Sequence, residues 1–156
     1  MRKYLPHILI ISFVFLLAPT AQVASYAGKI EDAKEEVRKN PDDAEEYFRE
    51  GRSYGFLRMW EMAIVPYKQA IRIDPDYRDA HYNLGNAYYE SGKYKEAIES
   101  YKQALRISPD YRDAHYNLGI TYLQMNDRDS ALKQYEILKE LNTRVANALF
   151  DLIYKE

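Results

Sequence analysis

Apolar and small residues in the middle of the chain recur at helical spacing in pairs of segments. In residues 81–88 they fall at i, i+3, i+4 and i+7, the spacing of one helix face. Ser91-Gly92 interrupts the pattern, which then resumes over residues 94–105. Pro109 ends this second segment, because proline supplies no amide hydrogen and disfavours helical geometry in the residue before it. The pattern predicts a helix, a turn and a second helix.

This pattern repeats along the chain at a fixed interval. Residues 67–82 read YKQAIRIDPDYRDAHY and residues 101–116 read YKQALRISPDYRDAHY, identical at 14 of 16 positions. A regular interval of this kind is typical of one supersecondary unit stacked on copies of itself. The register predicts three full units at 44–77, 78–111 and 112–145, with an N-terminal capping half-repeat at 28–43 and a C-terminal capping helix at 146–156.

The repeated residues resemble the tetratricopeptide repeat family. The family pattern of an aromatic residue, Leu-Gly, Tyr, Ala, an aromatic residue, Ala and Pro is matched in the second unit by His81, Leu84-Gly85, Tyr88, Ala97, Tyr101, Ala104 and Pro109. The resemblance covers about residues 29–156. It implies an all-α fold, a right-handed superhelical solenoid of stacked helix-turn-helix repeats with a C-terminal capping helix. The small residues leave room for close helix approach, and tyrosines fill the gaps between them.

The first unit departs most from the family pattern. Glu50 replaces the leucine, Arg58 replaces the turn glycine, and Pro66 lies within the expected second helix. A proline there removes one backbone hydrogen bond and costs about 3 kcal/mol or kinks the helix, so this unit has the least secure geometry. In the third unit Asn126 replaces the turn glycine, a mild change because Asn tolerates the left-handed conformation.

The segment 1–27 predicts a secretory signal peptide. It contains a basic lead (MRKYLPH), an apolar run (ILIISFVFLLA) and a tail with two small-residue cleavage contexts, at 23–25 and 25–27. We therefore expect an exported protein, periplasmic or secreted. The alternative is an uncleaved membrane anchor, although a bilayer span needs about 20 apolar residues and Pro19 interrupts the run early.

Composition excludes several functional classes. Removal of residues 1–27 takes away Arg2 and Lys3 and no acid, which changes the formal net charge from -2 to -4. No basic stripe remains for the phosphate contacts on which nucleic acid binding depends. The chain has no cysteine, which excludes disulfides, thiol catalysis and cysteine-bound metal.

Other candidate chemistry has a simpler explanation. His81 and His115 stand one repeat apart on the packing positions, and we interpret them as packed rings. The Asp-rich turns around Asp74 and Asp110 lack the central glycine and closing Glu of a calcium loop, so we interpret these aspartates as helix N-caps. No phosphate-binding loop or nucleophile elbow is present in the sequence. We expect no enzymatic activity, no cofactor and no metal.

A second stripe on the first helix of each unit lies off the packing positions. In the family the equivalent faces line a concave groove, so the resemblance implies a groove with an aromatic ladder of Phe48, Tyr82 and Tyr116. Aromatic rings give contact area, and Asn amides can bond an extended backbone. The predicted partner-binding residues are Phe48, Arg49, Arg52, Tyr82, Asn83, Asn86, Tyr89, Tyr116, Asn117 and Ile120. The alternative is that the residues of this stripe are common in repeats of this type and indicate no particular binding function.

Family members that clamp a free carboxylate carry Lys and Asn at positions that Phe48, Arg52 and Asp113 occupy here. That ligand is therefore disfavoured, and Arg49 and Arg52 instead make the first unit the cationic end of the groove. We expect a non-catalytic module that binds a peptide or helical segment of a partner protein.

A structural role is the alternative function, in which the chain forms a homo-oligomer through the groove or the terminal helix. The last helix supports it, because its apolar positions extend beyond what capping requires. These positions are Val145, Ala148, Leu149 and Leu152, together with Phe150 and Ile153.

Overall fold

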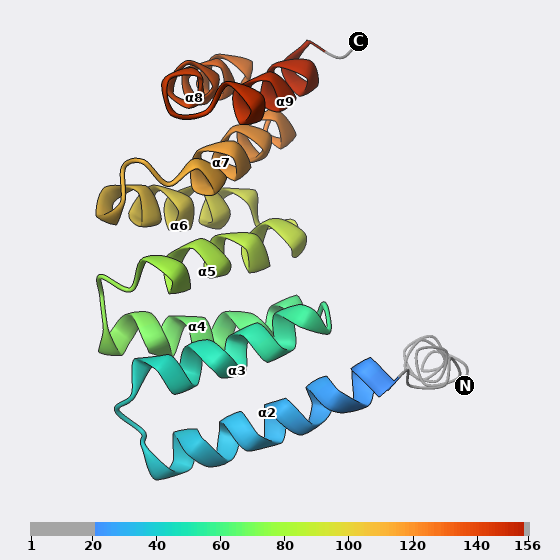
Figure 1. Cartoon of the computed structure of the whole chain (residues 1–156), viewed down its shortest axis with the longest axis vertical. Coiled ribbons are helices and arrows are strands. Elements are labelled where there is room, and N and C mark those ends of the chain that lie inside the picture. Colours follow the sequence, from blue (N-terminus) through green and yellow to red (C-terminus); the bar gives the residue numbers. More distant parts are fainter. Residues whose placement is uncertain (1–20, 155–156) are drawn as a thin grey trace, which may run out of the picture.

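The computed structural model describes residues 21–154, and these form eight helices in a continuous stack (Figure 1). Each helix packs mainly on the helix before it and the helix after it. The helices are α2 (Ala21–Lys39), α3 (Ala44–Phe56), α4 (Trp60–Ile73), α5 (Arg78–Glu90), α6 (Tyr94–Ile107), α7 (Arg112–Gln124), α8 (Arg128–Leu141) and α9 (Thr143–Ile153). The predicted all-α stack of helix-turn-helix repeats is confirmed.

The helix pairs α3–α4, α5–α6 and α7–α8 lie within residues 44–77, 78–111 and 112–145. At the C-terminal end α9 begins at Thr143, slightly before the expected capping segment, and at the N-terminal end α2 begins at Ala21. The basic lead and the apolar run of the predicted signal peptide lie outside the described residues. None of the helices between residues 21 and 154 is both long enough and apolar enough to span a bilayer.

The turn inside each repeat has the same backbone in all three units. Arg58, Gly92 and Asn126 adopt left-handed φ values of 57°, 73° and 57°. The residue after each donates its amide to a carbonyl of the preceding helix turn, as in Lys93 to Tyr88 at 2.8 Å. This Schellman geometry satisfies carbonyls that the helix end would leave unpaired. The turn is therefore set by the repeat, and Arg58 adopts it despite a local cost of about 1–2 kcal/mol.

Pro66 does not shorten the second helix of the first unit. Helix α4 runs through it for 14 residues, the same length as α6 and α8. The hydrogen bond that proline removes would have used the carbonyl of Met62, a residue that is 47% exposed. The chain on both sides of Pro66 stays helical.

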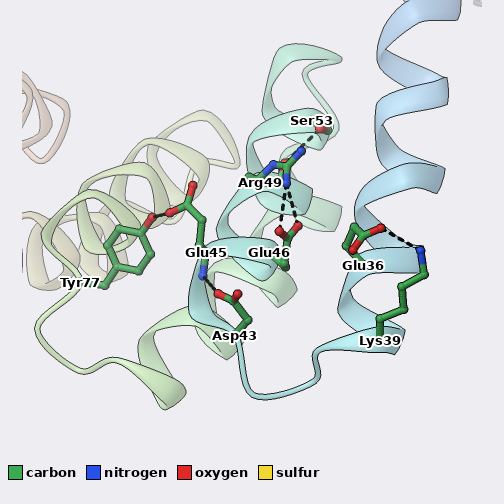
Figure 2. A network of polar contacts seen from close by, with 8 residues as sticks. All are labelled: Glu36, Lys39, Asp43, Glu45, Glu46, Arg49, Ser53 and Tyr77. Carbon is green, nitrogen blue, oxygen red and sulfur yellow. Dashed lines mark hydrogen bonds and ion pairs between the residues drawn. The ribbon is translucent and has the colours of Figure 1, made fainter.

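The expected N-capping by aspartate occurs at some helices and not at others. Asp43 accepts from the Glu45 amide at the start of α3 (Figure 2), and Asp127 caps α8. The N-caps of α5 and α7 are Tyr77 and Tyr111, which make no side-chain cap bond. The N-cap interpretation of Asp74 and Asp110 was therefore wrong. Both lie outside the capping position, and their carboxylates accept local bonds from the Asp76 amide and the Ser108 hydroxyl instead.

Glycine marks the closest helix contacts, as predicted. A Cβ on Gly51 or Gly85 would lie 2.5 or 2.6 Å from the ring of Tyr67 or Tyr101. The third unit differs, because the atom that would meet a Cβ on Gly119 belongs to Leu149 of α9, at 2.6 Å. Tyr135, which stands 34 residues after Tyr101, instead packs on Phe150 with ring centroids 5.3 Å apart.

The two histidines are packed rings, as the sequence indicated. His81 and His115 are 8% and 6% exposed. The Nε2 atom of each donates to the carbonyl of the proline that precedes its helix, at 2.9 Å for Pro75 and 2.8 Å for Pro109. Each imidazole therefore ties its helix to the preceding inter-repeat turn.

Candidate functional site

The first helices of the three repeats surround a hollow of about 420 Å³. Two tyrosines from the second helices, Tyr67 and Tyr101, reach into it and are almost fully buried. Its lining is Arg52, Gly55, Phe56, Trp60, Tyr67, Asn83, Asn86, Tyr89, Glu90, Tyr101, Asn117 and Ile120. We call this hollow the groove.

Six of the ten predicted binding residues line the groove, and four do not. Those in the lining are Arg52, Asn83, Asn86, Tyr89, Asn117 and Ile120. Phe48, Arg49, Tyr82 and Tyr116 are not among the lining residues. The predicted residues that line the groove thus come from α3, α5 and α7. The three residues of the proposed aromatic ladder are not among them.

Phe48 and Tyr82 pack between successive repeats. The Phe48 ring lies 4.9 Å from the ring of Tyr77, and the Tyr82 ring lies 4.9 Å from the ring of Tyr111. Each covering tyrosine is the N-cap of the first helix of the next repeat, α5 for Tyr77 and α7 for Tyr111. Phe48 is only 6% exposed, so it offers little surface to a partner.

The covering tyrosines are themselves held in place. Tyr77 donates its hydroxyl to the Glu45 carboxylate (Figure 2). The Arg78 guanidinium lies 4.8 Å from the centre of the Tyr111 ring, within cation–π range. Burial raises the pKa of Tyr111 to about 12, so its hydroxyl stays neutral at physiological pH. These contacts explain why the aromatic ladder works as inter-repeat packing.

Tyr116 occupies the equivalent place in the third unit. The residue that corresponds there to Tyr77 and Tyr111 is Val145, and both Tyr116 and Val145 pack against the buried cluster that contains Leu149 and Ile153. Tyr116 is therefore packed against a terminal cluster to which α9 contributes Ala146, Leu149 and Ile153.

The two predicted arginines have different surroundings. Arg49 makes two hydrogen bonds to the Glu46 carboxylate, at 3.0 and 3.1 Å, on the exposed surface of α3 (Figure 2). Arg52 lies 5.8 and 5.7 Å from the ring centres of Phe48 and Phe56. Among the described residues no carboxylate forms an ion pair with Arg52. Arg52 is therefore the cation that the groove can offer to a ligand.

A hydrogen-bonded network crosses the middle of the groove. Tyr101 donates its hydroxyl to Asn86 Oδ1 at 2.7 Å. Asn117 Nδ2 donates to the same oxygen at 2.9 Å and to the Tyr82 hydroxyl at 3.1 Å. Burial raises the pKa of Tyr82 and, still more, of Tyr101, so both phenols remain protonated. The network fixes the amides of α5 and α7 relative to one another.

Each groove asparagine has one side-chain amide atom that makes no hydrogen bond within the described residues. Asn83 Nδ2 donates to the Asp79 carbonyl at 2.8 Å, which leaves Asn83 Oδ1. Within residues 21–154, Asn86 Nδ2 and Asn117 Oδ1 also have no hydrogen-bond partner. The groove thus presents two acceptors and one donor, a set that can match the N–H and C=O groups of an extended chain.

Sequence reasoning missed four aromatic residues of the lining. Tyr67 and Tyr101 were assigned to packing alone, and Trp60 was not singled out. The signal was present for the tyrosines, since Gly51 and Gly85 leave one side of each ring uncovered by a Cβ. Phe56, which is 55% exposed, also lines the groove and was not among the predicted binding residues.

The arrangement offers contact area and hydrogen bonds. The lining contains aromatic rings, amides, one arginine and one glutamate, and it has no serine, cysteine or histidine that could act as a nucleophile or base. In the described part of the chain no three His, Cys, Asp or Glu side chains gather to hold a metal ion.

The fold is similar to that of solved structures of MamA. A crystal structure of MamA superposes with a TM-score of 0.80 at 25% identity and covers 85% of this chain and 78% of its own. A second MamA crystal structure gives a TM-score of 0.79 at 25% identity over 85% and 73% of the two chains. Residues 41 to the end of MamA from Desulfovibrio magneticus RS-1 give 0.73 at 19% identity over 80% and 70%. No curated protein matches this chain by sequence.

Family models match the repeats directly. The model described as TPR repeat matches residues 60–92 and 85–126, and the model described as Tetratricopeptide repeat matches residues 113–142. The first helix of the first unit lies outside these matches, in the unit whose sequence departs most from the pattern. Because the matches run from residue 60 to residue 142, more than half of the chain, the protein belongs to the tetratricopeptide repeat family.

Proposed function

We propose that this protein binds an extended segment of a partner protein in the groove, without catalysis of its own. Tetratricopeptide repeat domains bind other proteins, and this chain resembles MamA in fold. The observation that carries the proposal is the set of three groove amides, Asn83, Asn86 and Asn117, each with one end left over. A regular extended backbone can satisfy such a set without regard to its side chains.

The rest of the lining suggests the character of that segment. Phe56, Trp60 and Tyr89 supply aromatic surface for apolar side chains. Arg52 supplies a cation at the α3 side of the groove, which favours an acidic side chain in the ligand there. The expected ligand is therefore an extended segment with an acidic residue next to apolar or aromatic ones.

The groove is tested with matched double variants. Partners recovered by crosslinking from the native source are measured against wild type, Asn83→Ala/Tyr89→Ala and the control Asp129→Ala/Lys133→Ala. Both control residues are exposed on α8, away from the groove. The groove variant should weaken binding by about 2 kcal/mol or more, roughly 30-fold, as interface hot spots do. The control should bind like wild type.

Circular dichroism must show the same helix content for all three proteins. We use Tyr89 rather than Tyr82 because Tyr82 packs between repeats and its loss would disturb the fold. Full binding by the folded groove variant would contradict the proposal.

We further propose that the protein acts after export. The support is the basic lead, apolar run and small-residue tail of residues 1–27. Cleavage after Ser25 would keep Tyr26, whose ring stacks on Phe56 with centroids 4.7 Å apart, whereas cleavage after Ala27 would remove it. The intact mass of protein from its native compartment should therefore show a mature chain that begins at Tyr26. Recovery of the full-length chain from membranes would favour the anchored alternative.

Self-association is a second candidate function, and the surface of α9 favours it. Phe150, Leu152 and Tyr154 are 39%, 40% and 49% exposed. The expectation that Ile153 extends this exposed surface was wrong, because Ile153 is 3% exposed and belongs to the terminal core. Phe150→Ser with Leu152→Ser should therefore abolish oligomers in concentration-dependent light scattering while the groove still binds. A monomer at all concentrations in the wild type would rule this function out.

A further inference from the structure

A second hollow, of about 260 Å³, lies between α2 and α3, and we call it the α2 hollow. Arg52 and Phe56 of α3 line both this hollow and the groove, so the two meet at these side chains. From α2 the lining includes Tyr26, Lys29, Asp32 and Ala33. The binding surface therefore continues from the groove, past α3, onto the N-terminal half-repeat.

Two residues of α2 differ from their counterparts in the full repeats. Ala33 stands one repeat before Tyr67, a buried ring that reaches into the groove. Lys29 stands one repeat before Ala63, which is fully buried, whereas Lys29 is exposed. The small side chain of Ala33 leaves space where the repeats carry a tyrosine, and Lys29 adds a positive charge beside that space.

Two cations of the α2 hollow lie beside aromatic rings. The rings of Tyr26 and Phe56 stack with their centroids 4.7 Å apart. Lys29 Nζ lies 4.8 Å from the centre of the Tyr26 ring, and the guanidinium of Arg52 lies 5.7 Å from the centre of the Phe56 ring. Within residues 21–154 neither cation forms a hydrogen bond or an ion pair. Both therefore keep N–H donors for a ligand.

The remaining charges leave the α2 hollow positive. Arg49 also lines it, but Arg49 is paired with Glu46 of its own helix at 3.0 Å. Asp32 is the one acidic residue of the lining, and it has no ion pair among the described residues. Two unpaired cations thus stand against one unpaired carboxylate, a balance that favours an anionic ligand.

We propose that the α2 hollow binds two acidic side chains of the partner segment, one at Lys29 and one at Arg52. The segment then lies with its acidic end over α2 and its apolar end toward α7. This inference rests on the proposed function, whose ligand it lengthens and orients. Charge-assisted hydrogen bonds hold the carboxylates, and the rings of Tyr26 and Phe56 give contact area to the methylene groups.

The test uses tetraglutamate, with both ends blocked, as the probe in an NMR titration of the whole protein. It should shift the side-chain resonances of Lys29 and Arg52 saturably, and the shifts should disappear in about 1 M NaCl, where the screening length falls to about 3 Å. Blocked tetraglutamine has the same backbone without the charges and should not produce them. No saturable shift with tetraglutamate, or an equal response to tetraglutamine, would overturn the proposal.

A pair of lysine variants supplies the matched control. Lys29→Ala installs the residue that the full repeats carry at this position and should weaken tetraglutamate binding about threefold or more. Lys133→Ala removes an exposed lysine from α8, with the same change in net charge, and should bind tetraglutamate like wild type. Undiminished binding by a folded Lys29→Ala protein would overturn the proposal.

The groove variant Asn83→Ala/Tyr89→Ala separates this proposal from the proposed function. It keeps Lys29 and Arg52 and should therefore still bind tetraglutamate, whereas its binding of the native partner tests the groove. Loss of tetraglutamate binding in this folded variant would show that the probe occupies the groove, and would also overturn the proposal. Each proposal thus fails on its own measurement.

Discussion

The second and third repeats begin with the same sequence and yet pack differently. Residues 78–85 and 112–119 both read RDAHYNLG, and in both the final glycine leaves no room for a Cβ. Tyr101 from the same repeat covers Gly85, whereas Leu149 from the terminal helix covers Gly119. Tyr135, the counterpart of Tyr101, is only partly buried and packs on Phe150.

The reason lies in the helix that follows each pair. Helix α9 packs on α8 and also against α7, and it contacts that first helix more extensively than α5 contacts α3 or α7 contacts α5. Leu149 thereby reaches the gap that Tyr135 would otherwise fill. A repeated sequence thus specifies the gap beside the glycine, and the neighbouring helix decides which side chain fills it.

The largest expected difference is between the two tyrosines at equivalent positions. Tyr101 is 1% exposed and makes a hydrogen bond to Asn86. Tyr101→Ala should destabilise the protein by about 3–5 kcal/mol, as expected for truncation of a buried aromatic ring. Tyr135→Ala should cost about 1 kcal/mol, a typical value for a less buried site. Urea unfolding of both variants measures the difference, and equal costs would contradict the assignment of Leu149 to the third gap.

A smaller difference is expected between the glycines. Gly85→Ala places its methyl group against the rigid Tyr101 ring and should cost about 1–3 kcal/mol. Gly119→Ala meets the end of the Leu149 side chain, which can change rotamer, and should cost about 1 kcal/mol or less. Lys95→Ala on the exposed side of α6 is the control and should stay within about 0.5 kcal/mol. Thermal midpoints that fall more for Gly119→Ala than for Gly85→Ala would reverse the proposed packing.

The smallest effect concerns the turns, where all three repeats share one backbone. Arg58→Gly removes a Cβ from a left-handed residue and should stabilise the protein by up to about 1 kcal/mol. Asn126→Gly should have a smaller effect, since Asn adopts this conformation more readily. Arg58 also lies 3.6 Å from Glu90 in an exposed ion pair, so Glu90→Gln controls for its loss. A lower midpoint for Arg58→Gly than for Glu90→Gln would contradict a strained turn.

Much of the groove depended on contacts that the periodic pattern does not contain. The stripe on the first helices contains Asn83, Asn86 and Asn117, which share one lining in the structure. It could not show that Tyr77 and Tyr111 cover Phe48 and Tyr82, because each pair joins residues of different helices that are far apart in the sequence. The spacing of a helix face identifies which side chains lie on it, but not which of them a neighbouring repeat will cover.

The sequence by itself determined the architecture of this protein. Each repeat contacts mainly its neighbours, so a regular repeat with glycine and alanine at fixed places specifies the stack locally. Only the tertiary structure decided what fills particular gaps, as with Leu149 beside Gly119 and Gln134 beside His115. These outcomes depend on side-chain length and on how closely the next helix approaches, and neither is encoded in the repeat period.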